Sequence, residues 1–230
     1  MHSEASNRRS LLVALGDCNT EGHVAPSDAY PALVAQALGA EVLNCGHTMS
    51  TVREGWQYAK RKLTPNTAYL LVQYGLVDSW LTFRGAPYVL YYPDNLLRKL
   101  ARKLVKKLKK TGRRAGLQRW LGSKHVVSPA EYAQTLTRII YHARACSPGV
   151  LICLIATPPH LEDWRNAAIQ EFNRVMLSVA HQNHCSFVDV YPLFVGRREL
   201  YADSTHLNAE GHRVIANACL DAVRSSRACH

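Results

Sequence analysis

Two short stretches at opposite ends of this chain carry residues suited to joint chemistry. Cys18 lies near the amino terminus, and a thiolate is a strong nucleophile. Near the carboxyl terminus, Asp203 stands three residues before His206. A carboxylate at this spacing is able to orient one imidazole nitrogen while the other nitrogen acts as a base. Brought together, these three side chains would form a nucleophile, a general base and its orienting acid.

Each of these residues also has a purely structural interpretation. Free cysteine is among the most buried residue types, so Cys18 also fits a thiol packed beneath a turn. Asp203 also fits an aspartate that caps a helix beside a surface histidine at position 206. Both interpretations stay open at this level, and the elements that position the residues decide between them.

The elements around Cys18 favour a ligand-binding position. Residues 11–15 form an apolar run typical of a short buried strand, which Gly16 ends. Asp17 and Cys18 then lie on a tight turn into a helix, at the carboxyl end of the strand, where open α/β sheets bind ligands. We expect the helix N-terminus to favour the thiolate form of Cys18 and Asp17 to brace the turn through backbone hydrogen bonds.

The remaining chain alternates strands and helices. Further strands are expected at residues 41–44, 68–73, 150–156 and 186–190. Helices are expected from a Ser27 cap to Gly39, and at residues 50–63, 96–110, 128–145, 163–181 and 208–223. This alternation predicts an α/β fold, a doubly wound three-layer α/β/α sandwich with a five-stranded parallel sheet.

Length and composition suit one domain over residues 11–230, after a flexible tail at residues 1–10. No apolar run approaches the roughly 18 residues of a membrane span, and the first run is too short for a secretion signal. The seven cysteines are odd in number and lack a C-x-x-C pair, which indicates reduced thiols and no zinc site. We therefore expect a cytoplasmic protein without metal or cofactor.

The net charge of +11 is concentrated in one basic helical insertion, at about residues 76–124. Eleven Lys and Arg and no Asp or Glu lie from Arg98 to Arg119, whereas the rest of the chain is balanced in charge. Its helix carries one apolar stripe, formed by Leu97, Leu100, Leu104 and Leu108. A basic, glycine-containing loop is expected to follow at residues 112–123.

Three interpretations of this basic helix stay open. It is a solvated lid, a docking surface for an acidic carrier protein, an acidic glycan or a phosphorylated substrate, or a helix that lies on an anionic membrane surface. Specific nucleic-acid binding is not expected, because no base-reading motif accompanies the charge.

The motifs around Cys18 and His206 together resemble those of the SGNH (GDSL-type) hydrolases. Gly16-Asp17-Cys18-Asn19 matches the first block of that family with Cys in place of Ser, and Asp203-Ser204-Thr205-His206 matches the last. Three intermediate stretches lie where middle blocks fall, namely Asn44-Cys45-Gly46, Gly75-Leu76-Val77-Asp78 and Thr157-Pro158-Pro159. The resemblance covers residues 11–224 and implies a flavodoxin-like sandwich that transfers acyl groups through a covalent intermediate. It implies Cys18 as nucleophile, His206 as general base and Asp203 as its orienting acid.

The oxyanion hole departs from the family pattern. Of its donors, the family glycine falls at Met49 and the family asparagine at Val77, which has no side-chain donor. Losing one such donor typically costs ~10²–10³ in rate. A Met49 N–H still serves if the turn keeps its shape, and Asn19 is the first candidate to replace the missing side chain, ahead of His47. Gly75, Asp78 and Asp17 complete the candidate oxyanion and substrate-binding set.

Two functions from different classes follow. The first is an SGNH-type hydrolase or acyltransferase that forms an acyl-thioester on Cys18 from an acyl ester or thioester and passes the acyl group to water or an acceptor. The second is a catalytically altered module that binds an acylated or anionic ligand or carrier. Fast alkylation of Cys18 that depends on His206 would favour the first. Nucleotide binding is disfavoured, because the first turn has neither a G-x-G-x-x-G nor a P-loop pattern.

Overall fold

The computed structural model describes residues 10–114 and 117–228, without the side chains of residues 112–118, so the expected tail lies outside the described residues except for Ser10. The strands are β1 (Leu11–Gly16), β2 (Glu41–Gly46), β3 (Thr67–Gln73), β4 (Leu81–Phe83), β5 (Ser123–His125), β6 (Leu151–Ile155) and β7 (Ser186–Val188). The α-helices are α1 (Cys18–Glu21), α2 (Tyr30–Leu38), α3 (Val52–Lys62), α4 (Leu96–Arg114), α5 (Leu117–Leu121), α6 (Pro129–Cys146), α7 (Asn166–Gln182), α8 (Tyr191–Phe194) and α9 (Ala209–Ala228). Three 3₁₀ turns are η1 (Pro26–Asp28), η2 (Asp163–Arg165) and η3 (Arg198–Leu200).

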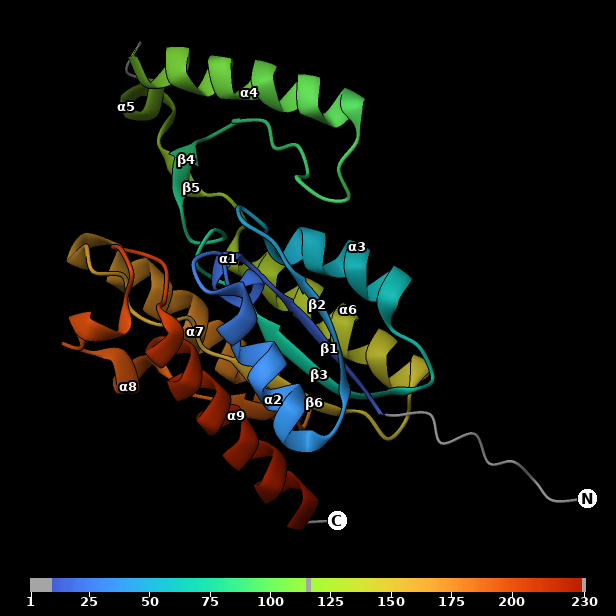
Figure 1. Ribbon diagram of the computed structural model, residues 1–230. Helices are drawn as coiled ribbons and strands as arrows, with labels where there is room; N and C mark the ends of the chain where they lie inside the picture. The colour runs from blue at the N-terminus through green and yellow to red at the C-terminus, as the bar shows by residue number, and fades with distance from the viewer. Residues whose placement is uncertain (1–9, 115–116, 229–230) are drawn as a thin grey trace, which may run out of the picture.

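Five parallel strands form the central sheet in the order β2-β1-β3-β6-β7. Helices α3, α6 and α7 cover one face and α2 and α9 cover the other, as the two hydrophobic clusters on either side of the sheet require (Figure 1). The predicted α/β/α sandwich with a five-stranded parallel sheet is therefore confirmed. Because β1 lies between β2 and β3, the residues that follow β1 emerge inside the row of strand carboxyl ends rather than at its border.

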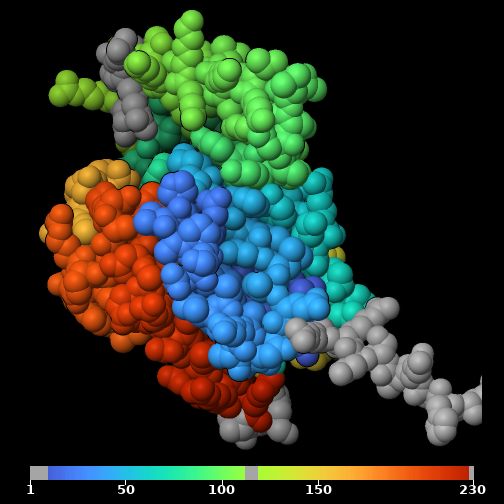
Figure 2. Space-filling model, in the orientation of Figure 1, coloured from blue at the N-terminus to red at the C-terminus, as the bar shows by residue number. Residues whose placement is uncertain are grey.

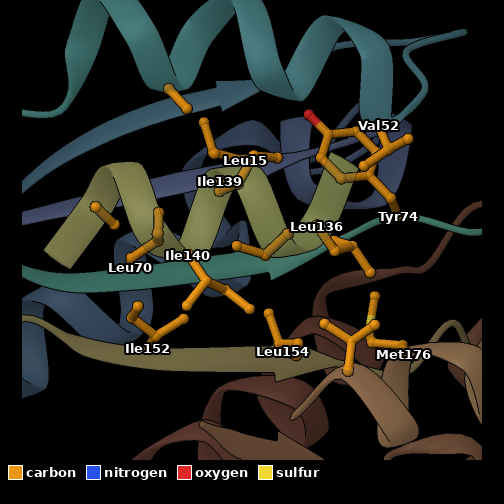
Figure 3. Packing of buried hydrophobic residues seen from close by; sticks show 14 of the residues in the cluster. Leu15, Val52, Leu70, Tyr74, Leu136, Ile139, Ile140, Ile152, Leu154 and Met176 are labelled. Atoms are coloured by element: carbon orange, nitrogen blue, oxygen red, sulfur yellow. The ribbon is translucent and has the colours of Figure 1, made fainter. Parts of the chain in front are cut away.

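The core explains why the strands read as unbroken apolar runs. Side chains of β1, β3 and β6 pack against α3 and α6, with Leu15, Leu70, Leu136, Ile140 and Leu154 all fully buried (Figure 3). Alternate residues of the same strands, such as Leu12 and Leu71, enter the cluster on the opposite face. A strand covered on both faces needs apolar residues at successive positions.

The predicted start of α2 differs from the structure. Ser27 lies within the turn η1, and α2 begins at Tyr30 behind Ala29, which makes no side-chain cap. Because Pro31 occupies the first turn and lacks an N–H, the helix needs one donor fewer to be satisfied there. The end of α2 at Gly39 is confirmed, with a left-handed φ of 64°.

The basic insertion follows β3 and precedes α6. Antiparallel pairing of β4 with β5 closes its base, and α4 lies beyond the carboxyl ends of the parallel strands (Figure 1). The loop expected at residues 112–123 is wrong, since α4 continues to Arg114 and α5 and β5 occupy most of the remainder. A single glycine costs about 1 kcal/mol within a helix, which does not outweigh the strong helix-forming Lys and Arg around Gly112.

Candidate active site

The turn after β1 holds Cys18 in a fixed position. Gly16 admits no side chain, because a Cβ there would lie 1.8 Å from Thr20 Oγ1 and 2.8 Å from the Gln73 carbonyl oxygen. Asp17 caps α1, its Oδ1 accepting a hydrogen bond from the Asn19 N–H at 3.0 Å. Cys18 is the first residue of α1 and is 4% exposed. The expectation that Asp17 braces this turn agrees with its contacts.

The surroundings of Cys18 oppose ionisation of its thiol. Burial, followed by the neighbouring Asp17 carboxylate, raises the pKa of the Cys18 thiol well above its usual range. Burial also raises the pKa of Asp17 itself to about 7. The expectation that the helix N-terminus favours the thiolate is therefore wrong, because α1 is a single turn of four residues and desolvation dominates.

Asp203 and His206 form a tight pair in the loop before α9. The Asp203 Oδ2 atom lies 2.7 Å from His206 Nδ1, and its Oδ1 accepts backbone hydrogen bonds from Thr205 and His206 at 2.7 Å each. Desolvation opposes ionisation of Asp203, but these three hydrogen bonds outweigh it and lower its pKa to about 2. An ionised Asp203 accepts the Nδ1 proton of His206, which leaves the Nε2 atom as a base.

Asn19 joins the nucleophile turn to the histidine loop. Its Nδ2 donates to the Thr205 carbonyl oxygen at 3.5 Å, and its Oδ1 accepts from the Leu207 N–H at 3.3 Å. The residue after Cys18 thus holds the backbone on both sides of His206. Within the described residues, no hydrogen bond links the Cys18 thiol to the His206 ring, and catalytic hydrogen bonds often tighten only when substrate binds.

Met49 supplies a backbone feature that suits an oxyanion donor. Its φ of 67° is the left-handed conformation that favours glycine. Within the part of the chain that the structure describes, no hydrogen bond is made by its N–H. Val77, which lines the same cavity as Met49, is buried, and its side chain provides no donor. The turn therefore keeps a glycine-like shape although a methionine occupies it.

Four other candidates have their polar groups engaged elsewhere. Both carboxylate oxygens of Asp78 accept backbone hydrogen bonds, from Val52 at 2.9 Å and Gly75 at 3.1 Å, and burial raises the pKa of Asp78 to about 8. The side-chain amide of Asn19 bonds to the backbone of the histidine loop. The His47 ring stacks on the Tyr92 ring, with the two ring centroids 4.1 Å apart. These bonds engage the polar groups of Asp78, Gly75 and Asn19 within the protein, because buried polar groups bond wherever partners are near. Oxyanion or substrate contacts by these three residues stay a prediction.

His160 is part of the site that sequence reasoning missed. Its Nδ1 accepts from the Glu162 N–H at 2.9 Å, so its Nε2 carries a proton and donates to Thr205 Oγ1, also at 2.9 Å. Asn166 binds both backbone groups of His160 through its amide. Burial lowers the pKa of His160, which keeps the ring neutral. Its position directly after Thr157-Pro158-Pro159 was the available signal.

A cavity of about 840 Å³ lies between this rim of the sheet and α4. Met49 contributes from the loop after β2, and Val77 and Trp80 contribute from the segment after β3. Cationic side chains contribute from the insertion and from η2, namely Arg102, Lys106, Lys109, Lys110 and Arg165, and the lining contains no Asp or Glu. The cavity therefore combines apolar walls with a positive potential.

The described residues contain no group of three or more His, Cys, Asp or Glu arranged to hold a metal ion. All six cysteines in the described ranges are free thiols. Nor does any helix there have both the length and the apolar character needed to cross a membrane.

Comparison with known families assigns this chain to a class of proteins. Residues 14–214 match the model of the GDSL-like Lipase/Acylhydrolase family, which covers most of the chain. The chain therefore belongs to this family, whose members are SGNH hydrolases. No curated protein sequence matches the chain significantly.

Solved structures share the fold over nearly the whole chain at low sequence identity. LAE5, an alpha/beta hydrolase enzyme from the metagenome of Lake Arreo, is 23% identical with a TM-score of 0.62, over 94% of this chain and 95% of its own. A catalytic mutant of Axe2, an acetylxylan esterase from Geobacillus stearothermophilus, is 20% identical with a TM-score of 0.62, over 94% of each chain. The lipase/acylhydrolase from Enterococcus faecalis is 17% identical with a TM-score of 0.64, over 94% and 96%.

Proposed function

We propose that the protein is an ester hydrolase or acyltransferase that forms an acyl-thioester on Cys18. One observation carries the proposal. The amide of Asn19 holds the backbone before and after His206, so the Asp203–His206 pair is fastened to the one-turn helix that begins with Cys18. An isolated structural cysteine would require no such attachment to the loop of an ordered histidine and aspartate, where the bonded backbone groups lie 186 and 188 residues from Asn19.

The raised pKa of the Cys18 thiol defines how the reaction begins. His206 Nε2 takes the thiol proton as Sγ attacks the carbonyl carbon of the substrate, because no stable thiolate precedes the attack. The tetrahedral intermediate collapses, and the leaving alcohol or thiol departs with the proton from His206. Water or another acceptor then attacks the thioester, His206 accepts its proton, and the thiol is regenerated.

Backbone donors stabilise the oxyanion in this proposal. Cys18 is the first residue of α1 and Met49 has a glycine-like backbone, so each offers an N–H at the site. The third donor of the family is an asparagine side chain, and Val77 at that position has no donor. We expect a rate roughly 10²–10³ below that of a site with all three donors.

The cavity indicates the substrate class. Met49 and Val77 line it and Cys18 and His206 do not, so in this proposal a substrate reaches Cys18 past the Met49 turn and its non-reacting part extends beneath α4. Its cations, among them Arg102, Lys106 and Lys110, favour an acyl ester or thioester that carries an anionic group. Trp80 contributes a buried Nε1 donor that has no partner within the described residues.

Intact-protein mass spectrometry tests the covalent step. Wild type and the variants Cys18→Ala and His206→Ala are exposed briefly to activated acyl esters and acyl-thioesters, with and without a carboxylate or phosphate group. Cys45→Ala is the matched control, because Cys45 is equally buried at the end of the adjacent strand β2. An acyl mass gained by wild type and Cys45→Ala, but lost in Cys18→Ala, is the expected result.

The fate of that adduct separates the two reactions. An acyl-enzyme that decays in water alone indicates a hydrolase, and one that decays only with added amine, alcohol or thiol indicates a transferase. No adduct and no turnover with any ester would overturn the proposal. The runner-up, a binding module for an acylated or anionic ligand, is favoured by the protonated Cys18 and by Val77. It would then be tested by calorimetric titration with the same anionic esters.

A further inference from the structure

Helix α4 turns its leucines outward rather than toward the protein. Five leucines follow one another along its solvent side, with exposed fractions of 75% at Leu96, 78% at Leu97, 58% at Leu100, 61% at Leu104 and 50% at Leu108. They cover about 18 Å of helix length at 1.5 Å per residue. An amphipathic helix that only packs on its own domain buries such a stripe, so α4 is inverted relative to this ordinary arrangement.

Polar contacts hold α4 in the inverted orientation. Arg102 binds Asp94 at 2.6 Å and donates to the carbonyl oxygens of Leu90 and Tyr91. Arg98 donates to the Pro93 carbonyl oxygen at 2.6 Å. These arginines, half-buried beneath the helix, fix its underside to the segment before it. These polar contacts on the opposite side of α4 therefore determine that the leucines face outward.

Cations and a tryptophan accompany the exposed leucines. Along α4, one row beside the stripe carries the exposed lysines Lys103 and Lys107. Helix α5 packs against α4 and presents Trp120, which is 90% exposed, and Leu121, which is 46% exposed. Figure 2 shows α4 (green) as the outermost layer of the molecule at this end, where a large flat partner has free access.

We propose that α4 and α5 form a docking surface for an anionic lipid bilayer, with α4 lying in the plane of the interface. Helices of this kind bury the apolar face about 5–10 Å below the headgroups while lysines contact anionic lipid, and tryptophan prefers the same depth. An acidic glycan offers nothing apolar to five leucines. A protein partner would need a complementary groove along the full 18 Å of a convex helix.

Docking of α4 on a bilayer would also fix which side of the cavity faces the membrane. Arg102, Lys106 and Lys109 of α4 line the cavity from their side of the helix, while Leu100 and Leu104 face away from it. The bilayer would therefore lie directly over the cavity that adjoins Met49 and Val77. The surface and its test do not depend on whether Cys18 is reactive, so docking and the proposed chemistry fail independently.

Vesicle sedimentation with the full chain tests the docking surface. Wild type is expected to partition to equimolar phosphatidylglycerol and phosphatidylcholine vesicles far more strongly than to pure phosphatidylcholine, at about fivefold per engaged lysine. The double variant Leu100→Gln/Leu104→Gln should weaken partitioning by about 100-fold, since each leucine that leaves the acyl boundary is worth about tenfold. Both residues are exposed, so folding is preserved, which circular dichroism verifies.

Matched controls and Trp120 localise the contact. Leu193→Gln/Val195→Gln changes two exposed apolar residues outside the insertion and should bind as wild type does. The fluorescence of Trp120, identified by its loss in Trp120→Phe, should shift to the blue and be quenched by brominated lipid. Wild type that ignores anionic vesicles would overturn the proposal. Leucine variants that bind vesicles as strongly as wild type would also overturn it. So would a protein that binds heparin as strongly as it binds vesicles, because the partner would then be a polyanion or an acidic protein.

Discussion

Removing the amide that fastens the histidine loop is the sharpest test of the site. In Asn19→Ala the Thr205 carbonyl and the Leu207 N–H lose their partner, at contacts of 3.5 and 3.3 Å. Two hydrogen bonds of this length contribute together about 1–2 kcal/mol, part of which is the cost of leaving the Leu207 N–H buried and unpaired. For a chain of this size that loss corresponds to a fall in Tm of roughly 2–8 °C.

The effect on the reaction should exceed the effect on stability. A displacement of about 1 Å in His206 relative to Cys18 costs up to ~10² in rate, so we expect acylation of Cys18 to slow by about 10–100-fold at 25 °C. The rate is measured by mass spectrometry with an activated ester in excess. Circular dichroism at that temperature checks that the variant is folded, so that a slower rate reports the position of His206.

Asn183→Ala provides the comparison. Asn183 is buried to nearly the same extent, 6% against 4% exposed, and its Nδ2 donates to the Val179 carbonyl oxygen at 2.8 Å, at the end of α7. It should lower the Tm similarly and leave acylation unchanged. Equal acylation rates in the two variants would refute the view that Asn19 positions His206.

Three further changes have defined outcomes. Asp17→Asn keeps a good helix cap but removes the carboxylate that raises the thiol pKa, so iodoacetamide at pH 8 should alkylate Cys18 about tenfold faster. Glu54→Ala removes the acceptor of the α3 capping box and of the Tyr88 hydroxyl, and urea unfolding should show a loss of about 3 kcal/mol. Burial raises the folded pKa of Asp78 to about 8, so the folded state keeps a proton that the unfolded chain loses near pH 4, and stability falls as pH rises through this window. Between pH 6.5 and 8 the free energy of unfolding should drop by about 2 kcal/mol more in wild type than in Asp78→Asn.

The fold was predictable because its determinants are local and repeated. Each parallel strand is covered on both faces, which produces a continuous apolar run, and Gly39 ends α2 as its position predicts. The end of α4 was not predictable from Gly112, since a weak local penalty competes with helix-forming neighbours. The outward leucines of α4 were also invisible in the sequence. The hydrophobic periodicity of a sequence defines an apolar and a polar face of a helix, but it does not say which face packs against the rest of the protein.

The contact between Asp203 and His206 was predictable from the sequence, and the hydrogen bonds around it were not. The spacing of Asp203 and His206 is short, so their 2.7 Å contact follows from the loop itself. The amides of Asn19 and Asn166 act on backbone groups elsewhere in the chain, and only the fold shows which groups those are. Asp78 lies in a motif that matches a substrate-facing block, yet its carboxylate binds Val52 and Gly75.

The burial of Cys18 changes what a cysteine contributes here. A thiolate paired with a charged imidazole is already deprotonated, so its attack on a carbonyl carbon needs no further base. In this protein burial and Asp17 keep the thiol protonated, and the proton must leave as the bond to carbon forms. In the proposed mechanism Cys18 therefore reacts like a serine hydroxyl rather than like a preformed thiolate. His206 must then accept the thiol proton during the attack, so we predict that His206→Ala abolishes acylation of Cys18 by an activated ester, measured by intact-protein mass spectrometry.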